Sequence, residues 1–377
     1  MTESSSSRKV RGPGLPGPRC NVGVLVGMSG GVDSSVAAML LQKEGYRVVG
    51  VTLQLWDDPA ASGDRTCCSP DAVQRAKSTA HQLLIPHLTV DARSIFRERV
   101  VEYFVGEYGA GRTPNPCAKC NSRLRFEFML GLARKLGLDH LATGHYARLT
   151  GDPAGLTRGV DSNKDQSYVL AEVAPELLRQ VLFPLGELTK PEVRSLAAEA
   201  GLIGRSAPES QEICFIPDDD HYRFLEERLG ERPGAIVDES GRAWGRHRAT
   251  YRFTIGQRKG LGIAHGAPLF VVDLDAERRE VRVGERQALA VGVVHIDGVV
   301  SHRPPTGRQS SVQLRSSGRT LCARLRDAVT IALEQPAFGV APGQTAVLYE
   351  GENVVLAGTI VGTERWDSGS VPTSGAE

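Results

Sequence analysis

The sequence has no apolar run that could cross a membrane. Its longest runs, at residues 36–41 and 48–53, are far shorter than the roughly 20 residues that a membrane-spanning helix requires. Residues 1–19 are rich in Ser, Gly and Pro and contain no apolar segment of the kind that a secretory signal needs. These absences exclude a membrane protein and predict a location in the cytoplasm.

A clear excess of charge of either sign is also missing. The chain contains 45 basic and 44 acidic residues, so its overall charge argues neither for nor against binding to nucleic acid. Two stretches, 240–272 and 301–326, nevertheless contain six basic residues each and no acidic residue. Such stretches can neutralise RNA phosphates, although charge alone is explained equally well by a solvated surface. The basic residues are Arg242, Arg246, Arg248, Arg252, Arg258 and Lys259, then Arg303, Arg308, Arg315, Arg319, Arg324 and Arg326.

Length and composition predict two or three globular domains. A chain of 377 residues is too long for one compact domain. Its composition, 41% apolar and 24% charged, is too apolar for a disordered protein. No internal repeat is present. Both ends, 1–19 and 366–377, are polar enough to predict disordered tails.

The first half has the pattern of an α/β domain with a parallel sheet. Strand-like segments at 21–27 and 46–53 enclose a helical segment at 34–44, which makes a βαβ unit. A third strand is expected at 138–143. Further helices are expected at 70–84, 92–108, 121–136 and 189–200, the last with a capping box of Thr189 and Glu192.

After residue 216 the pattern changes to short strands and turns, which predicts two β-rich domains. Turn signals at 275–278 and 350–353 indicate hairpins. We therefore expect an ATP-binding domain at 20–216, a small central β-rich domain at 217–290 and a C-terminal β-barrel at 291–365. The strands are expected at 269–274, 280–283, 291–299, 311–315, 322–325, 329–333, 345–349 and 354–360.

A phosphate-binding loop is indicated between the first strand and the first helix. Residues 29–34 read Ser-Gly-Gly-Val-Asp-Ser, in which the glycines allow backbone N–H groups to approach phosphate and the helix N-terminus adds partial positive charge. Asp33 is expected to hold Mg²⁺ or to position the loop. The segment has neither the ending of a Walker loop nor the spacing of a dinucleotide fingerprint. An ordinary tight turn is the alternative.

This loop resembles that of the PP-loop ATP pyrophosphatase superfamily, whose members cleave ATP between its α- and β-phosphates. The resemblance implies ATP and Mg²⁺ as cofactors, with adenine near Leu53 and Gly144. The implied ATP-binding residues are Gly27, Met28, Ser29, Gly30, Gly31, Val32, Asp33, Ser34, Leu53 and Gly144.

Seven cysteines are present, and their close spacing in a reducing compartment indicates chemistry or metal binding before structural disulfides. Cys117 and Cys120 form a Cys-x-x-Cys pair, which suits redox exchange or metal binding because both thiols reach one point. A second such pair is missing, which disfavours zinc. Cys214 stands apart. We interpret the remaining four as incidental: Cys20, Cys67, Cys68 and Cys322.

At these residues the chain resembles the tRNA-specific 2-thiouridylases over about residues 20–365. Seven ordered motifs carry the resemblance: the phosphate loop, 112–121, 142–146, 164–168, 214–217, 254–262 and 342–344. It implies that Cys214 carries persulfide sulfur, that Cys120 is its catalytic partner and that Asp33 serves the ATP step. The implied tRNA contacts are Asn115, Pro116, Cys117, His145, Lys164, Asp165, Gln166, Arg315, Ser316 and Gln344.

The sequence departs from the family at three positions. Cys117 stands where many members have Asp, and a third thiol beside Cys120 and Cys214 matches the variant associated with a [4Fe–4S] cluster. We therefore favour three cluster ligands, Cys117, Cys120 and Cys214, and keep persulfide exchange through Cys120 and Cys214 as the other route. Ser316 and Ala207 replace residues, often Tyr and Lys, that the family uses near RNA.

The sequence thus predicts a sulfurtransferase that converts the wobble uridine of tRNA to 2-thiouridine, with a sulfur donor protein or hydrosulfide as its second partner, and not a DNA-binding protein. An amide-forming synthetase of the same superfamily is the alternative enzyme, but it needs no paired thiols. A tRNA-binding metalloprotein with a vestigial ATP loop is the non-enzymatic alternative, and the intact loop argues against it.

Overall fold

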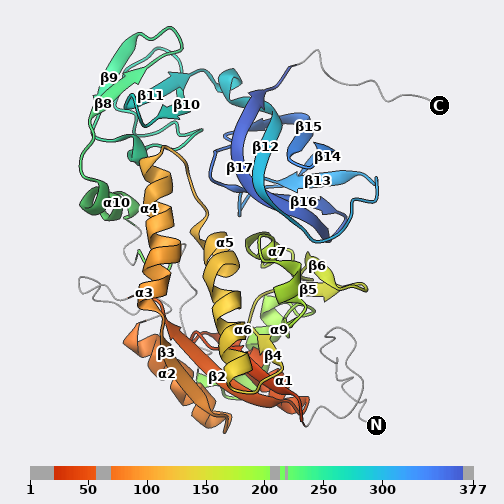
Figure 1. The fold of residues 1–377 in the computed structure, drawn as a ribbon. Helices are drawn as coiled ribbons and strands as arrows, with labels where there is room; N and C mark the ends of the chain where they lie inside the picture. The colour runs from red at the N-terminus through yellow and green to blue at the C-terminus, as the bar shows by residue number, and fades with distance from the viewer. Residues whose placement is uncertain (1–20, 57–68, 204–212, 217–219, 368–377) are drawn as a thin grey trace, which may run out of the picture. The chain divides into compact units, whose positions relative to one another are not determined.

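The computed structural model describes residues 21–56, 69–203, 213–216 and 220–367 (Figure 1). The expected tails lie outside these residues apart from Trp366 and Asp367, as do Cys20, Cys67, Cys68 and Ala207. The chain forms two compact units, which we call the first unit (1–99 and 120–219) and the second unit (100–119 and 220–377).

The first unit contains a parallel sheet, as the sequence predicts, and it has five strands, of which three were expected. The strands are β1 (Gly23–Gly27), β2 (Arg47–Gln54), β3 (His87–Asp91), β4 (His140–Ala142) and β7 (Val181–Leu182), in the order β3-β2-β1-β4-β7. The chain proceeds from β1 to one side of the sheet and then returns to β4 on the other side. Ligands bind at such a switch point, outside the carboxyl ends of the strands.

Helices of the first unit bury their apolar faces against this sheet. Val36, Ala38 and Leu41 are wholly buried in the first helix, whose two ends are marked by Gly31 and Gly45. The helices are α1 (Val32–Lys43), α2 (Pro70–Gln82), α3 (Arg93–Phe96), α6 (Phe126–Lys135), α7 (Ser167–Leu170), α8 (Pro175–Leu178) and α9 (Lys190–Glu199). An antiparallel hairpin of β5 (Ala147–Thr150) and β6 (Gly155–Arg158) follows β4.

The second unit begins with a mixed four-stranded sheet. Its strands are β8 (Gly234–Val237), β9 (Ala243–His247), β10 (Phe270–Asp275) and β11 (Glu280–Gly284), in the order β10-β11-β8-β9. Helix α10 (His221–Leu229) precedes this sheet, and a short 3-10 turn, η5 (Thr250–Arg252), follows β9. The core of this domain includes Val271 of β10 and Val281 and Val283 of β11, all wholly buried.

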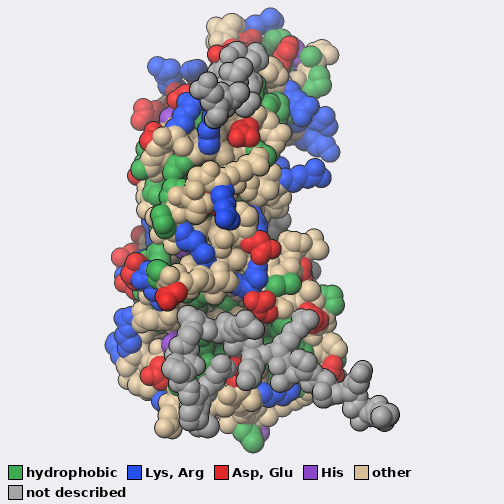
Figure 2. All heavy atoms as spheres, turned by 90° about the vertical axis from the view of Figure 1, so that its right-hand side faces the viewer, with side chains coloured by type: hydrophobic (Ala, Val, Ile, Leu, Met, Phe, Trp, Pro, Cys, Tyr) green, Lys and Arg blue, Asp and Glu red, His purple; other side chains and the backbone are tan. Residues whose placement is uncertain are grey.

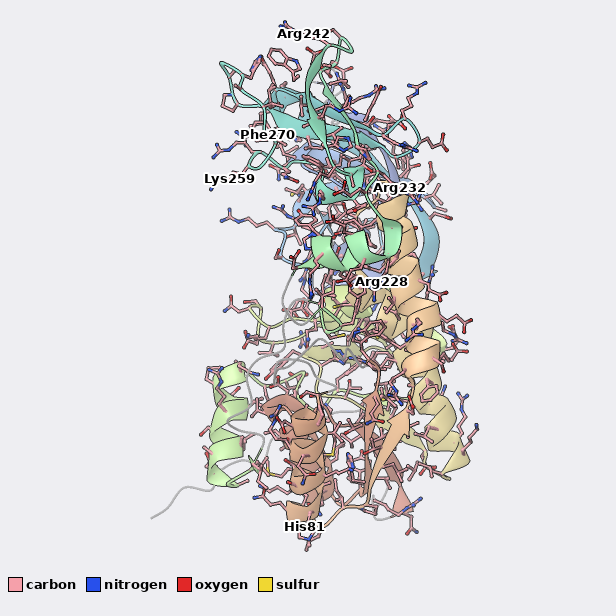
Figure 3. The ribbon with its side chains drawn as sticks, turned by 90° about the vertical axis from the view of Figure 1, so that its left-hand side faces the viewer. His81, Arg228, Arg232, Arg242, Lys259 and Phe270 are labelled. Carbon is pink, nitrogen blue, oxygen red and sulfur yellow. The ribbon has the colours of Figure 1, made fainter. Side chains whose placement is uncertain are left out.

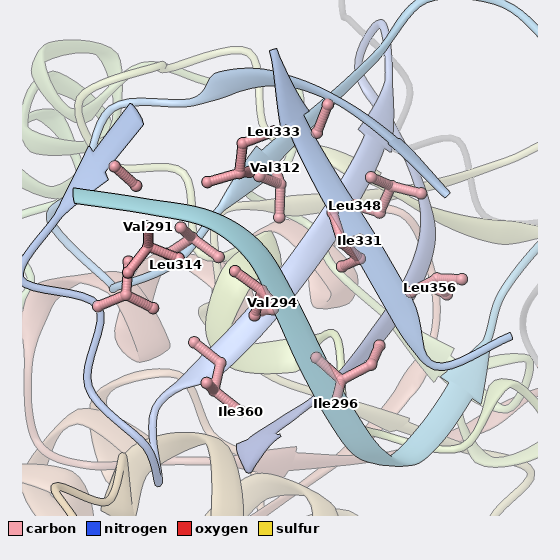
Figure 4. Packing of buried hydrophobic residues seen from close by; sticks show 14 of the residues in the cluster. Val291, Val294, Ile296, Val312, Leu314, Ile331, Leu333, Leu348, Leu356 and Ile360 are labelled. Carbon is pink, nitrogen blue, oxygen red and sulfur yellow. The ribbon is translucent and has the colours of Figure 1, made fainter. Parts of the chain in front are cut away.

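A closed six-stranded antiparallel barrel completes the second unit. Alternating apolar residues, among them Val294, Ile331 and Leu348, fill its interior (Figure 4). A 3-10 turn, η6 (Arg286–Leu289), leads into it. The strands are β12 (Ala290–Ser301), β13 (Ser310–Gln313), β14 (Leu321–Asp327), β15 (Thr330–Phe338), β16 (Thr345–Glu350) and β17 (Asn353–Arg365), and pairing of β12 with β17 closes the barrel.

The structure differs from the predicted elements in several places. Six strands were not predicted individually: β3, β5, β6, β7, β8 and β9. The helix expected at 121–136 begins earlier, with α5 (Pro116–Cys120) and the π-helical turn η3 (Asn121–Arg125). The C-terminal barrel was expected to end at residue 365. Its hydrogen bonding continues one residue further, where the N–H of Trp366 donates to the carbonyl of Ala290 over 2.8 Å.

The segment 100–119 belongs to the second unit, although the expected boundary places it in the ATP-binding domain. Its helix α4 (Glu102–Gly109) continues the helix expected at 92–108 through the π-helical turn η2 (Arg97–Val101). Phe104 of α4 packs edge-on against Phe224 of α10, with ring centroids 6.3 Å apart. Aromatic packing between residues 120 positions apart leaves no local sequence signal.

Candidate active site at the phosphate loop

The loop between β1 and α1 is closed by its own hydroxyl groups. Ser34 Oγ donates to the carbonyl of Gly31 over 3.1 Å and accepts from the N–H of Ser29 over 3.2 Å. Gly30 has a φ of +77°, and a Cβ there would lie 2.3 Å from the carbonyl oxygen of Ala72. Only glycine therefore fits, and the loop presents backbone N–H groups beside the N-terminus of α1, as a phosphate cradle requires.

Asp33 is held by two side chains from distant parts of the first unit. Lys190, the first residue of α9, places its Nζ 2.7 Å from both carboxylate oxygens. The hydroxyl of Tyr146, beyond the end of β4, donates to Asp33 Oδ1 over 2.8 Å. Burial, followed by the charge and hydrogen bond of Asp33, raises the pKa of Tyr146, so this hydroxyl stays a proton donor at neutral pH.

Lys190 and Tyr146 were not singled out from the sequence. The one local signal is the capping box of α9, which the structure confirms. It fixes the start of the helix, and Lys190 is the first residue of that helix. The ion pair itself joins residues 157 positions apart. The Lys190 side chain is 10% exposed, whereas the Asp33 side chain is 33% exposed, so the carboxylate is the more open partner.

Residues after β4 pack directly against the phosphate loop. A Cβ at Gly144 would lie 2.8 Å from the backbone N of Ser34, so the absence of a side chain allows this approach. Leu53, the other residue expected near adenine, is buried in β2, one residue before that strand ends. Both residues thus lie in the carboxyl-end region of the sheet, consistent with the expected ATP site.

His145 lies in an aromatic environment. Its Nδ1 is 2.8 Å from the Thr143 hydroxyl, and its ring lies 6.0 Å and 6.3 Å, centroid to centroid, from those of Phe126 and Phe183. Burial, with a smaller contribution from Arg125, lowers the pKa of His145 to about 3. The ring is therefore neutral at neutral pH and cannot offer positive charge to an RNA phosphate.

The predicted tRNA contacts after β6 hold the backbone of the first unit together. Asp165 accepts hydrogen bonds from Arg158 Nη1 and from the backbone N–H of Gly159 and Ser167. Gln166 Oε1 accepts from the N–H of Tyr146. The N–H of Lys164 donates to the carbonyl of Asp161, which closes the same turn. These contacts give Asp165 and Gln166 a structural role that needs no RNA.

Asn115 and Gln344 have similar internal roles in the second unit. Asn115 Oδ1 accepts from the N–H of Cys117 and of Ala118, and so caps the short helix α5. Gln344 Nε2 donates to the carbonyl of Thr113 over 2.9 Å. Pro116, the first residue of α5, is buried.

The three cysteines of the sulfur site differ in exposure. Cys117 is exposed and Cys120 is buried on the same turn of α5, and Cys214 is intermediate. The segment carrying Cys214 is anchored by its neighbour Phe215, which is 1% exposed. The ring of Phe215 packs against Trp56 and Phe96, with centroids 6.2 Å and 5.7 Å away.

The described residues do not form a preformed metal site. Within them, no three His, Cys, Asp or Glu side chains are grouped so that they could hold one metal ion. The cluster ligands expected from the sequence, Cys117, Cys120 and Cys214, stay a prediction. Asp33 likewise has Lys190 on both oxygens in place of an open position for Mg²⁺.

Basic side chains cover part of the second unit (Figures 2 and 3). Arg242 and Lys259 are exposed on loops around the four-stranded sheet (Figure 3). Arg315 and Ser316 are exposed after β13, where their carbonyls accept from Gln313 Nε2. Arg252 does not belong to this surface, because it pairs with Glu226 of α10.

Family models match almost the whole described chain. A model described as a tRNA methyl transferase HUP domain matches residues 22–218, a PRC-barrel domain model of the same series matches 222–285, and an aminomethyltransferase beta-barrel model matches 299–360. The bifunctional protein NifU/MnmA of Rubrobacter xylanophilus is 47% identical over 343 residues, which cover 90% of this chain and 70% of the relative. The tRNA-specific 2-thiouridylase MnmA of Geotalea uraniireducens is 45% identical over 358 residues, 89% of this chain and 94% of the relative.

The chain belongs to the tRNA-specific 2-thiouridylase family. Members of this family are tRNA sulfurtransferases with a PP-loop domain, which agrees with the phosphate loop and the parallel sheet described above. A further member, from Heliobacterium modesticaldum, is 45% identical over 90% of this chain and 92% of its own length. None of the helices in the described ranges has both the length and the apolar character that a membrane crossing needs.

Proposed function

We propose that this protein is an ATP-dependent tRNA-uridine 2-sulfurtransferase of the cytoplasm, which converts the wobble uridine of tRNA to 2-thiouridine. One observation supports the ATP step. The phosphate loop, in which Gly30 has no room for a side chain and Asp33 pairs with Lys190, lies at the switch point of a parallel sheet. Family membership supports the sulfur step.

In the first step the phosphate loop binds ATP, which enters with Mg²⁺ on its phosphates. The C2 oxygen of uridine attacks the α-phosphorus and pyrophosphate leaves, so that the oxygen becomes part of an AMP leaving group. Backbone N–H groups at the start of α1 stabilise the charge that develops on the phosphates. Asp33, fixed by Lys190 and Tyr146, holds the first turn of α1 in the geometry that this requires.

In the second step Cys214 carries a persulfide received from a sulfur donor protein. Its terminal sulfur attacks C2, and AMP leaves. The Cys120 thiolate then attacks the Cys214 sulfur, which breaks the sulfur–sulfur bond, releases 2-thiouridine and leaves a Cys120–Cys214 disulfide. An external dithiol reduces that disulfide before the next turnover. This route uses two thiols and assigns no chemical role to Cys117.

The tRNA is bound through phosphate contacts on the second unit. Exposed Arg242, Lys259 and Arg315 are suited to neutralise RNA phosphates. The anticodon loop is single-stranded, so moving its base into a pocket costs less than extrusion from a duplex.

The proposal is tested by mass spectrometry of tRNA nucleosides after incubation with ATP, Mg²⁺, a persulfide donor and a dithiol. We expect 2-thiouridine with wild-type protein, and none when tRNA carries cytidine at the wobble position. Absence of 2-thiouridine with this donor and also with hydrosulfide under anaerobic conditions would contradict the proposed function.

A further inference from the structure

Lys190 has a hydrogen-bonding capacity that its structural role leaves unused. An ammonium group has three N–H donors. Among the described residues, the Lys190 ammonium hydrogen-bonds only to the two oxygens of Asp33, both at 2.7 Å. One donor therefore remains for another acceptor, on a side chain that is 10% exposed and thus restricted in where it can point.

The position of this ammonium is fixed from the backbone. Lys190 opens α9, where Thr189 and Glu192 form the capping box. Its own N–H donates to Asp161 Oδ2 over 2.9 Å. The Lys190 ammonium lies over the Tyr146 ring, with Nζ 5.8 Å from the ring centroid. An ammonium held in this way loses little further conformational freedom when it binds a ligand.

The charges around the loop require a cation if a polyphosphate is to bind. The N-terminus of α1 contributes about half of a positive charge, whereas the Asp33 carboxylate in its first turn contributes a full negative charge. Without Lys190 the loop would present net negative charge to the phosphates of ATP. With Lys190 the balance becomes positive.

We propose that Lys190 is a phosphate-binding residue that donates its third N–H directly to the polyphosphate of ATP while it remains paired with Asp33. The inference rests on the proposed function only in taking ATP as the ligand of the loop. It adds to the loop a contact from α9, an element that lies more than 150 residues further along the chain.

The test is nucleotide binding to the full-length protein, without tRNA or sulfur donor, by displacement of a fluorescent ATP analogue. For Lys190→Met we expect ATP and inorganic pyrophosphate to bind about tenfold to a hundredfold more weakly, the range of one lost hydrogen bond to a charged group. Adenosine, which has no phosphate, should bind the variant and the wild type equally.

Arg194→Met is the matched control. Arg194 lies one turn further along α9 and is exposed, so this change removes the same charge from the same helix; its charge is the smallest of the influences on the pKa of Tyr146, which it lowers. We expect less than about a twofold effect on ATP affinity, because solvent screens an exposed charge.

A double variant separates direct contact from charge neutralisation. If Lys190 acts only by neutralising Asp33, its replacement should cost nothing in the Asp33→Asn background. If it contacts phosphate, Asp33→Asn/Lys190→Met should bind pyrophosphate about tenfold more weakly than Asp33→Asn alone. The double variant leaves neither charge buried alone, so it remains informative if Lys190→Met unfolds.

Unchanged affinity of Lys190→Met for ATP and pyrophosphate would overturn the inference, as would a penalty that disappears in the Asp33→Asn background. Equal weakening of adenosine would overturn it too, because that pattern means a general distortion of the site. If the wild-type protein fails to thiolate tRNA while Lys190→Met still shows the predicted pyrophosphate penalty, the proposed function is contradicted and the role of Lys190 is kept.

Discussion

The phosphate loop of the first unit and the basic surface of the second unit handle charge in opposite ways. At the loop, Asp33 and Lys190 form a partly buried ion pair with fixed geometry, which suits the binding of one small anion in one orientation. On the second unit, Arg242, Lys259 and Arg315 are exposed, which suits contact with a long polyanion at adjustable positions. The comparison teaches that chemistry and RNA affinity should respond to different substitutions.

The largest effect is expected at Cys214. Replacing its sulfur atom by oxygen should stop sulfur transfer and leave adenylation intact. Cys214→Ser should reduce 2-thiouridine to background, because a hydroxyl cannot carry transferable sulfur. Pyrophosphate release on addition of tRNA should persist, because adenylation depends on the loop. Both products can be measured in the same reaction. Continued thiolation would remove Cys214 from the mechanism.

The next largest effect is expected at Asp33. Asp33→Asn should slow pyrophosphate release by about 100-fold to 1000-fold, the usual loss when one element of a charge-stabilising site is removed. Affinity for tRNA, measured by filter binding, should stay within about twofold, since the phosphate contacts proposed for tRNA are on the second unit. Collapse of tRNA binding together with intact adenylation would reverse this division of roles.

A smaller and salt-dependent effect is expected at Arg315. Arg315→Ala should weaken tRNA binding and reduce the slope of log affinity against log salt concentration by about one, as loss of one phosphate contact does. ATP affinity should not change. Lys43→Ala, which removes an exposed cation from the end of α1, is the control and should leave the slope unaltered. A slope unchanged in both variants would exclude Arg315 from the RNA surface.

The smallest effect is expected at Cys117, and it decides between the two sulfur routes. Because the proposed persulfide route uses only Cys120 and Cys214, Cys117→Ala should thiolate as well as wild type with a persulfide donor. Anaerobic reconstitution should not yield the roughly four irons per chain that a [4Fe–4S] cluster requires. If Cys117→Ala loses both iron and thiolation, the cluster route that the sequence favoured is correct and the persulfide route is wrong.

Local sequence patterns were sufficient for much of the fold. Gly30, Gly31 and Ser34 predicted the loop because its requirements are short-range: positive φ, no Cβ and a nearby hydroxyl. The capping box of α9 and the hairpin turn at 350–353 were predicted for the same reason. Strand β3 was missed, because its five residues include a charged and a polar residue and lie between two strong helical patterns.

What the sequence by itself determined was the identity of the loop, the parallel sheet before a β-rich half and the residues that resemble the family. Only the tertiary structure decided that Lys190 and Tyr146 converge on Asp33, that Asn115 caps a helix and that 100–119 pack with the second unit. The physical reason is range. Turns and caps are set by neighbours in the chain, whereas ion pairs and packing partners are set by which elements the fold brings together.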